Sequence, residues 1–195
     1  MKLEPLELAG AYCLRPEPRG DERGRLTRLF CRETFAELGL ADCSRQISEV
    51  TNPARHTLRG LHFQRAPHAE TKLIWVTRGA LYDVLVDLRP NSPTHGRWQA
   101  LELSAGAGEQ IYAPAGLAHG YLTLSDDVAM VYFIDTPYAP DAAMGINYAD
   151  PDLAIPWPSP PAVISDKDCG WPTMARFEAA TLAARAAEVA RGRGD

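Results

Sequence analysis

Cysteine is scarce in this sequence, and what there is lies scattered. The four cysteines among 195 residues are Cys13, Cys31, Cys43 and Cys169, with no Cys-x-x-Cys spacing. A structural zinc site or a redox dithiol normally needs such a pair. Free cysteines usually serve as small packing residues. We therefore expect four reduced, mostly buried thiols without a catalytic role.

Long apolar runs and an excess of basic charge are also missing. Residues 1–5 place an acid and a proline where a signal peptide would carry its apolar region, and no run approaches membrane-spanning length. The formal net charge is -5, whereas nucleic acids and anionic membranes attract proteins that have a basic face. We expect a cytoplasmic protein that binds neither.

Helical periodicity is nearly absent between residues 12 and 163. Short β-like runs there alternate with turn clusters, which is typical of an antiparallel sandwich or barrel. The clearest run, residues 82–88, places four apolar side chains on one face and Asp83 and Asp87 on the other, so it predicts a half-buried strand.

Further strands are expected at residues 72–77 and 127–134, and helices at residues 34–40 and 174–191. The length suits one domain. We predict a single all-β domain over residues 1–195, with its core at about residues 10–170 and a helical tail at 171–195.

One motif near the middle of the chain resembles the second sequence motif of the cupin superfamily. Gly108, Pro114, Gly116 and His119 follow its spacing, and Thr123 stands where the motif ends in Asn. The resemblance implies a cupin-type β-barrel, and it places His119 inside that barrel.

The first cupin motif has lost its metal ligands in this chain. It normally offers His-x-His and then a Glu, but here His62 is followed by Gln64, and Lys72 takes the place of the Glu before Gly79. A protonated lysine repels a divalent ion and cannot ligate it. We therefore expect no metal and no other cofactor.

His62 is free to act as an acid or base where no metal is bound. A free imidazole titrates near neutrality, which suits a general base. From spacing alone, a core histidine that hydrogen-bonds to the backbone is an equally open interpretation.

A wider resemblance begins at the block Arg59-Gly60-Leu61-His62-Phe63-Gln64, which is similar to the signature of the dTDP-4-dehydrorhamnose 3,5-epimerase family. Other blocks follow the family's order and spacing, at residues 20–24, 72–73, 78–79, 83–89, 114–120, 150–151, 157–158 and 165–168. The resemblance covers about residues 10–170. It implies a cupin-type jelly-roll sandwich and a cofactor-independent isomerase that inverts C3 and C5 of a nucleotide-linked 4-keto-6-deoxy hexose.

The resemblance implies catalytic roles for four side chains. His62 is the base that removes the proton next to the C4 ketone, Asp168 its partner, and Tyr132 the acid on the opposite face of the sugar. Lys72 is expected beside the oxyanion that forms at C4. Without the resemblance, Asp168 is a turn residue, Tyr132 a packed strand aromatic and Lys72 a lysine at the barrel mouth.

Five more residues match substrate-binding positions of the family: Arg23, Arg59, Gln46, His119 and Tyr138. The two arginines correspond to groups that bind the diphosphate, His119 to a wall of the sugar pocket, and Gln46 and Tyr138 to contacts of the base. Arg23 lies in a segment that reaches into the neighbouring subunit's site, which implies a homodimer. Exposed arginines in surface ion pairs are the alternative.

Departures from the family pattern leave the substrate open. This chain has Gln46-Ile47-Ser48 where the family often reads Gln-x-Asn, and Leu26 where many members have an aromatic residue. The nucleotide could therefore be dTDP, CDP or GDP. Inversion at C3 alone or at C5 alone is the main alternative reaction, and a metal-dependent cupin or a non-catalytic binder of nucleotide sugars are the other classes.

Overall fold

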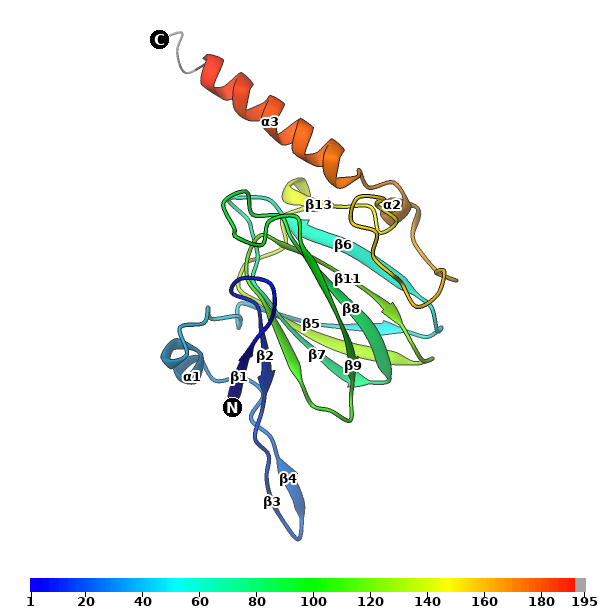
Figure 1. Ribbon diagram of the computed structural model, residues 1–195. Helices are drawn as coiled ribbons and strands as arrows, with labels where there is room; N and C mark the ends of the chain where they lie inside the picture. Colours follow the sequence, from blue (N-terminus) through cyan, green and yellow to red (C-terminus); the bar gives the residue numbers. More distant parts are fainter. Residues whose placement is uncertain (192–195) are drawn as a thin grey trace.

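The computed structural model of the protein describes residues 1–191 (Figure 1). Two antiparallel β-sheets pack against each other, which confirms the predicted sandwich. The strand order is β1-β2-β10-β7-β12-β5 in the six-stranded sheet and β13-β6-β11-β8-β9 in the five-stranded sheet. The strands are β1 (Lys2–Pro5), β2 (Tyr12–Arg15), β3 (Arg19–Asp21), β4 (Gly24–Leu26), β5 (Gln46–Asn52), β6 (Leu58–Gln64), β7 (Lys72–Arg78), β8 (Ala80–Asp87), β9 (Trp98–Ser104), β10 (Gln110–Ala113), β11 (Leu117–Thr123), β12 (Val128–Ile134) and β13 (Ala143–Gly145).

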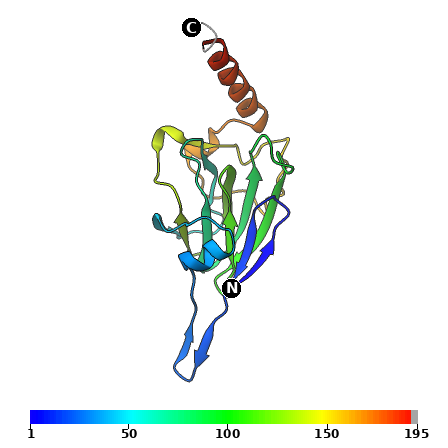
Figure 2. The ribbon, with the colours of Figure 1, turned by 90° about the vertical axis from the view of Figure 1, so that its left-hand side faces the viewer.

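The helices are short, apart from the one near the C-terminus. They are α1 (Arg32–Glu37), the 3-10 helix η1 (Pro140–Ala142), α2 (Asp166–Cys169) and α3 (Met174–Arg191). The first helix lies slightly earlier than predicted, whereas α3 has the predicted bounds and projects away from the sandwich (Figures 1 and 2). Residues 192–195 of the predicted tail lie outside the described residues. No helix in residues 1–191 is both long and apolar enough to cross a membrane.

Alternate side chains of the two sheets meet in the core of the sandwich. Ile74 of β7 and Ile111 of β10 pack from one sheet against Leu85 of β8 and Tyr121 of β11 from the other. Burial of such apolar surface is the main stabilising contribution to a sandwich of this kind.

The prediction that the strand now seen as β8 is half-buried is wrong. Asp83 and Asp87 are fully buried, and so are the apolar residues between them. The outer face of β8 is covered by Ile146, Leu153 and Trp157 from the chain that follows β13. Asp83 and Asp87 lie on the inner face together with Leu85, where they have buried hydrogen-bond partners, so the face expected to meet solvent lies inside the sandwich.

Strands β6 and β11 approach each other unusually closely at Gly60. Its φ is +127°, and a Cβ atom there would lie 2.5 Å from the Cα atom of Gly120 and 2.9 Å from the carbonyl oxygen of His119. Only glycine fits this position. The pairing register sets His62 opposite His119, so the close approach brings two histidines side by side.

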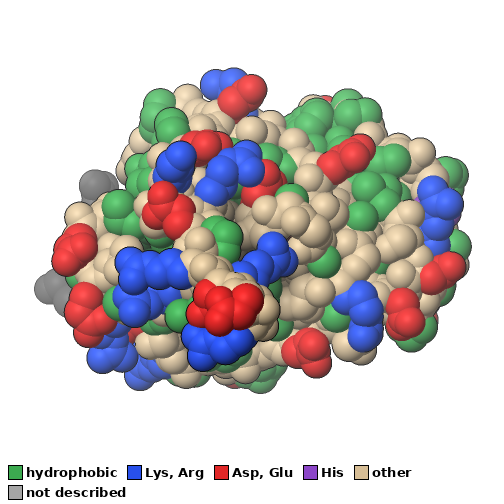
Figure 3. Space-filling model, turned by 90° about the horizontal axis from the view of Figure 1, so that it is seen from below, with side chains coloured by type: hydrophobic (Ala, Val, Ile, Leu, Met, Phe, Trp, Pro, Cys, Tyr) green, Lys and Arg blue, Asp and Glu red, His purple; other side chains and the backbone are tan. Residues whose placement is uncertain are grey.

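A hairpin made of β3 and β4 projects from one end of the molecule, and α3 projects from the other end (Figures 1 and 2). Every residue of its two strands is exposed, and within residues 1–191 the strands pair only with each other. The hairpin therefore has no core of its own in the single chain. The face of the molecule that is seen from below shows acidic and basic side chains intermingled (Figure 3).

The cysteines only partly meet expectation. All four are free thiols, with Cys13 and Cys43 buried, Cys31 partly exposed and Cys169 exposed. The expectation of mostly buried thiols is wrong for Cys169 because α2, which it ends, lies outside the sandwich.

Candidate active site

A cavity of about 400 Å³ lies at the edge of the sandwich where both sheets contribute side chains. Eight of the nine predicted site residues line it: Gln46, Arg59, His62, Lys72, His119, Tyr132, Tyr138 and Asp168. They come from β5, β6, β7, β11, β12, the segment after β12, and α2. Residues up to 122 positions apart, Gln46 and Asp168, thus meet in one place.

His62 and Asp168 form a close pair on one side of the cavity. The His62 Nε2 atom lies 2.6 Å from Asp168 Oδ1. The other carboxylate oxygen accepts a hydrogen bond from the Gly60 backbone N–H at 3.3 Å. The Ser165 side chain caps α2 by accepting from the Asp168 backbone N–H at 3.1 Å, which fixes the turn that carries the carboxylate.

Burial raises the pKa of Asp168, but the hydrogen bond and charge of His62 and the hydrogen bonds from Gly60 and Trp171 outweigh burial. The pKa of Asp168 consequently lies below its usual value. The carboxylate therefore stays ionised near neutral pH, so it can hold the imidazole ring and stabilise a proton on it.

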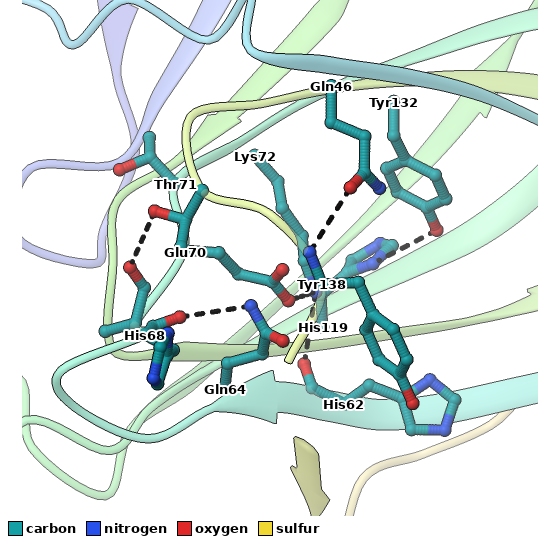
Figure 4. Close-up of polar contacts among 12 residues, drawn as sticks. Gln46, His62, Gln64, His68, Glu70, Thr71, Lys72, His119, Tyr132 and Tyr138 are labelled. Atoms are coloured by element: carbon teal, nitrogen blue, oxygen red, sulfur yellow. Dashed lines mark hydrogen bonds and ion pairs between the residues drawn. The ribbon is translucent and has the colours of Figure 1, made fainter. Parts of the chain in front are cut away.

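Lys72 lies deeper in the cavity and is paired (Figure 4). Its Nζ atom lies 2.9 Å from Glu70 Oε1 and donates to the His62 carbonyl oxygen at 3.4 Å. Both side chains of this ion pair are nearly buried. The ammonium group is thus held at the first residue of β7, close to the backbone that carries His62.

Tyr132 reaches the cavity from the six-stranded sheet, whereas His62 comes from the five-stranded sheet. The Tyr132 hydroxyl lies 3.4 Å from His119 Nδ1, and His119 Nε2 lies 2.6 Å from Asp83 Oδ1. Burial raises the pKa of Tyr132 well above its ordinary value, with nearby Tyr121 and Asp83 adding to the effect. The phenol is therefore protonated at neutral pH.

Three residues predicted to bind the nucleotide lie near the cavity mouth. Arg59 is exposed, and its Nε donates to Asn52 Oδ1 at 2.9 Å. Gln46 Oε1 accepts from the Tyr138 backbone N–H at 3.3 Å, while the Tyr138 side chain is 58% exposed. Terminal guanidinium nitrogens and a phenol ring thus remain accessible to a ligand.

Arg23 is the predicted site residue that the chain does not bring to its own cavity. It lies in the turn between β3 and β4, pairs with Asp21 and has a side chain that is 83% exposed. Its position on the projecting hairpin keeps it away from the other eight.

Sequence reasoning missed several polar or aromatic residues of the site, among them Glu70, Asp83 and Trp171. Glu70 is two residues before Lys72, a spacing that could have suggested their pairing. Asp83 contacts His119 only because β8 and β11 are neighbours in a particular register, which the sequence does not specify. Trp171 is considered further below.

The residues around His62 do not suit a metal ion. The Gln64 amide is used by the backbone, since it donates to the His68 and Pro137 carbonyl oxygens and accepts from the Ala139 N–H. Within residues 1–191, no three His, Cys, Asp or Glu side chains are grouped so as to hold a metal.

A second and larger cavity, of about 560 Å³, lies between α3 and the sandwich. Its walls are mostly apolar, and its charged groups include the pair His95–Glu178 at 2.8 Å. No tyrosine or lysine accompanies this pair among the described residues that line the larger cavity, whereas the smaller cavity combines a His–Asp pair with both, so the smaller cavity is the candidate active site.

Fold and cavity together define a cupin-type β-sandwich with acid and base side chains in its cavity. The family model for dTDP-4-dehydrorhamnose 3,5-epimerase matches residues 5–176. The chain belongs to this family.

Relatives extend over nearly the whole chain. A dTDP-4-dehydrorhamnose 3,5-epimerase of Sinorhizobium fredii is 38% identical, with 89% of this chain and 90% of the relative covered. A dTDP-4-dehydro-6-deoxyglucose 3-epimerase of a Streptomyces species is 36% identical, with 90% of each covered. The crystal structure of the Bacillus anthracis 3,5-epimerase with TDP and pyrophosphate bound is 39% identical with a TM-score of 0.84, and 89% of this chain and 99% of that one are covered.

Proposed function

We propose that this protein inverts C3 and C5 of a dTDP-linked 4-keto-6-deoxy hexose. The observation that carries the proposal is the meeting of the His62–Asp168 pair and Tyr132, from opposite sheets, in one cavity that also holds Lys72. The names of the relatives support dTDP as the nucleotide.

The first step is removal of a proton. His62 Nε2 lies against Asp168, so the ring accepts the C–H proton at Nδ1, and the electron pair of the broken bond moves to the C4 oxygen as an enolate. Asp168 stabilises the imidazolium that forms. Lys72 places a positive charge where the enolate oxygen develops.

The second step is return of a proton from the other side. Tyr132 donates its hydroxyl proton to the same carbon on the opposite face, and the electron pair returns from the C4 oxygen to restore the ketone. The phenolate then recovers a proton from solvent, while His62 releases the one it took. Since the pKa of Tyr132 is raised, the group starts each cycle as the acid.

The diphosphate is proposed to lie between Arg59 of one chain and Arg23 of a second copy. Three facts support this: the β3–β4 hairpin is exposed, it projects from the sandwich, and Arg23 is far from its own cavity. Gln46 and Tyr138, at the mouth, are proposed to contact the base. The active unit is then a homodimer. Each of its subunits is one domain over residues 1–195.

Inversion at C3 alone is the second candidate, because a relative with this activity in its name is 36% identical to the chain. In this proposal the two reactions use the same acid and base. They differ in how far the sugar ring can turn between His62 and Tyr132.

The test is solvent deuterium exchange followed by proton NMR, on dTDP-, CDP- and GDP-linked 4-keto-6-deoxyglucose. We expect deuterium at both C3 and C5 of the dTDP sugar, no exchange with His62→Asn, and exchange without the inverted product with Tyr132→Phe. Label at one carbon favours the single epimerase. If the unaltered protein binds the sugar but exchanges no proton, it is a non-catalytic binder and the proposal fails.

A further inference from the structure

Trp171 lies beside the His62–Asp168 pair and has no part in the reaction as described. It follows α2, lines the cavity, and packs its indole against Gly145 of β13. A Cβ atom on Gly145 would lie 2.5 Å from two atoms of that ring. Gly145 pairs with His62 across the sheet, so the absence of a side chain at 145 lets the indole approach the histidine.

The indole contacts both members of the pair. Its Nε1–H donates to Asp168 Oδ1 at 3.1 Å, and this is the oxygen that lies 2.6 Å from His62 Nε2. Its ring meets the His62 ring edge-on, with centroids 6.3 Å apart and an interplanar angle of 74°. Asp168 is thus held by Trp171 and His62 at one oxygen and by the Gly60 N–H at the other.

We propose that Trp171 is a positioning residue for the epimerase reaction, which holds the Asp168 Oδ1 atom where His62 requires it. The inference rests on the proposed function. Without the indole, His62 would be the donor at Oδ1, so this oxygen could shift together with the ring that it has to orient; a second donor on the same oxygen holds it independently of His62. A base oriented by such a carboxylate loses rate when its partner can turn away.

The same hydrogen bond affects the charge of Asp168. The Trp171 N–H is one of the donors that hold the pKa of Asp168 down against burial. The ionisable side chains that line the same cavity include His62 and Arg59 from β6, Tyr121 from β11 and Lys167 from α2. Lys167 lies over the indole, 5.3 Å from its centroid, and a phenylalanine keeps an aromatic face beneath it, so we expect Trp171→Phe to leave these charges in place.

The test variant is Trp171→Phe, which keeps an aromatic ring and removes the donor. Trp157→Phe is the matched control, since the Trp157 N–H donates to the Tyr148 carbonyl oxygen at 2.9 Å outside the cavity. We expect Trp171→Phe to lower kcat about tenfold, the effect of one hydrogen bond to a charged group, with KM changed by less than about twofold. The control should leave both constants unchanged.

The carboxyl titration of Asp168 gives a readout that does not depend on turnover. It is followed by carbon NMR of protein labelled at aspartate, with the signal assigned by its loss in Asp168→Asn. We expect the midpoint to lie at higher pH in Trp171→Phe than in the unaltered protein and in Trp157→Phe.

Gly145→Ala provides an independent perturbation, because the added methyl group must displace the indole. We expect it to reproduce the loss of kcat and the titration shift, and to add nothing further in a Trp171→Ala background. An unchanged titration midpoint or an unchanged kcat in Trp171→Phe overturns the inference. If the unaltered protein exchanges no substrate proton, the proposed function fails, and the titration still decides whether Trp171 controls this carboxylate.

Discussion

Replacement of Glu70 by Gln tests what the ion pair in the cavity contributes. Glu70 and Lys72 are 11% and 10% exposed, and their charged atoms are 2.9 Å apart. Glutamine has the same shape and keeps an acceptor oxygen, so the change removes the negative charge and leaves an ammonium group with little water around it.

The expected cost follows from that burial. Removal of one partner from a fully buried ion pair costs about 3–5 kcal/mol. Since some water reaches this pair and the glutamine oxygen still accepts a hydrogen bond, we expect Glu70→Gln to lower the free energy of unfolding by about 2–3 kcal/mol. Urea denaturation at pH 7 measures this value.

An exposed pair provides the control. Glu4 and Arg15 are 50% and 45% exposed with 3.0 Å between their charged atoms, so Glu4→Gln should cost less than about 1 kcal/mol. Substitution of Lys72 by Met together with Glu70→Gln removes the uncompensated charge and should recover at least half of the loss. An equal cost for Glu70→Gln and Glu4→Gln, or a fully additive double variant, would refute the reasoning.

Three more expectations concern stability and thiol reactivity. Gly60→Ala should lower the free energy of unfolding by more than about 2 kcal/mol in urea, whereas Gly24→Ala, at a similar φ of +130° with no atom within 4 Å, should cost less. Burial raises the pKa of Asp87, but hydrogen bonds from neighbouring side chains outweigh burial and lower the pKa well below its usual range. The ionised carboxylate therefore stabilises the folded protein above about pH 4, where the carboxyl group of the unfolded chain titrates. This stabilisation is lost as the pH falls. Asp87→Asn should thus be less stable at pH 7 and show a flatter loss of stability in acid, and a steeper loss would contradict this. A thiol reagent at pH 8 should modify exposed Cys169 quickly and Cys43 slowly, since burial raises the pKa of Cys43 to about 12; equal rates would show that the native fold opens readily.

The sandwich was predictable because its strands carry local signals. The runs that became β7, β8 and β12 stand out in the sequence by alternation and turn residues, and their predicted bounds are close to those of the structure. What the sequence could not supply is the cover on the outer face of β8. That cover comes from the segment that contains Leu153 and Trp157, over 60 residues further along the chain, and local alternation contains no information about it.

The candidate site, like the fold, was predictable only in part. The resemblance placed eight residues that the fold then brings to one cavity, because it supplied long-range information that spacing lacks. It did not predict the contacts of Asp83 and Trp171, since these depend on strand register and on a missing side chain at Gly145. Contacts of this kind follow from three-dimensional packing and not from a local pattern.

The loss of the metal ligands has a consistent electrostatic consequence in this cavity. Lys72 stands where a metal-binding cupin has its acidic ligand, and Glu70, two residues earlier, returns a negative charge to the same wall. The pair is neutral as a whole, so the cavity carries little net charge from it before a substrate binds. In the proposed reaction, an enolate oxygen near the ammonium would meet a positive charge whose position Glu70 and the His62 carbonyl already fix, and no reorientation of that charge would be needed as the proton leaves. A lysine held in this way can supply the electrostatic stabilisation that a metal ion supplies elsewhere, while His62 stays free to accept a proton.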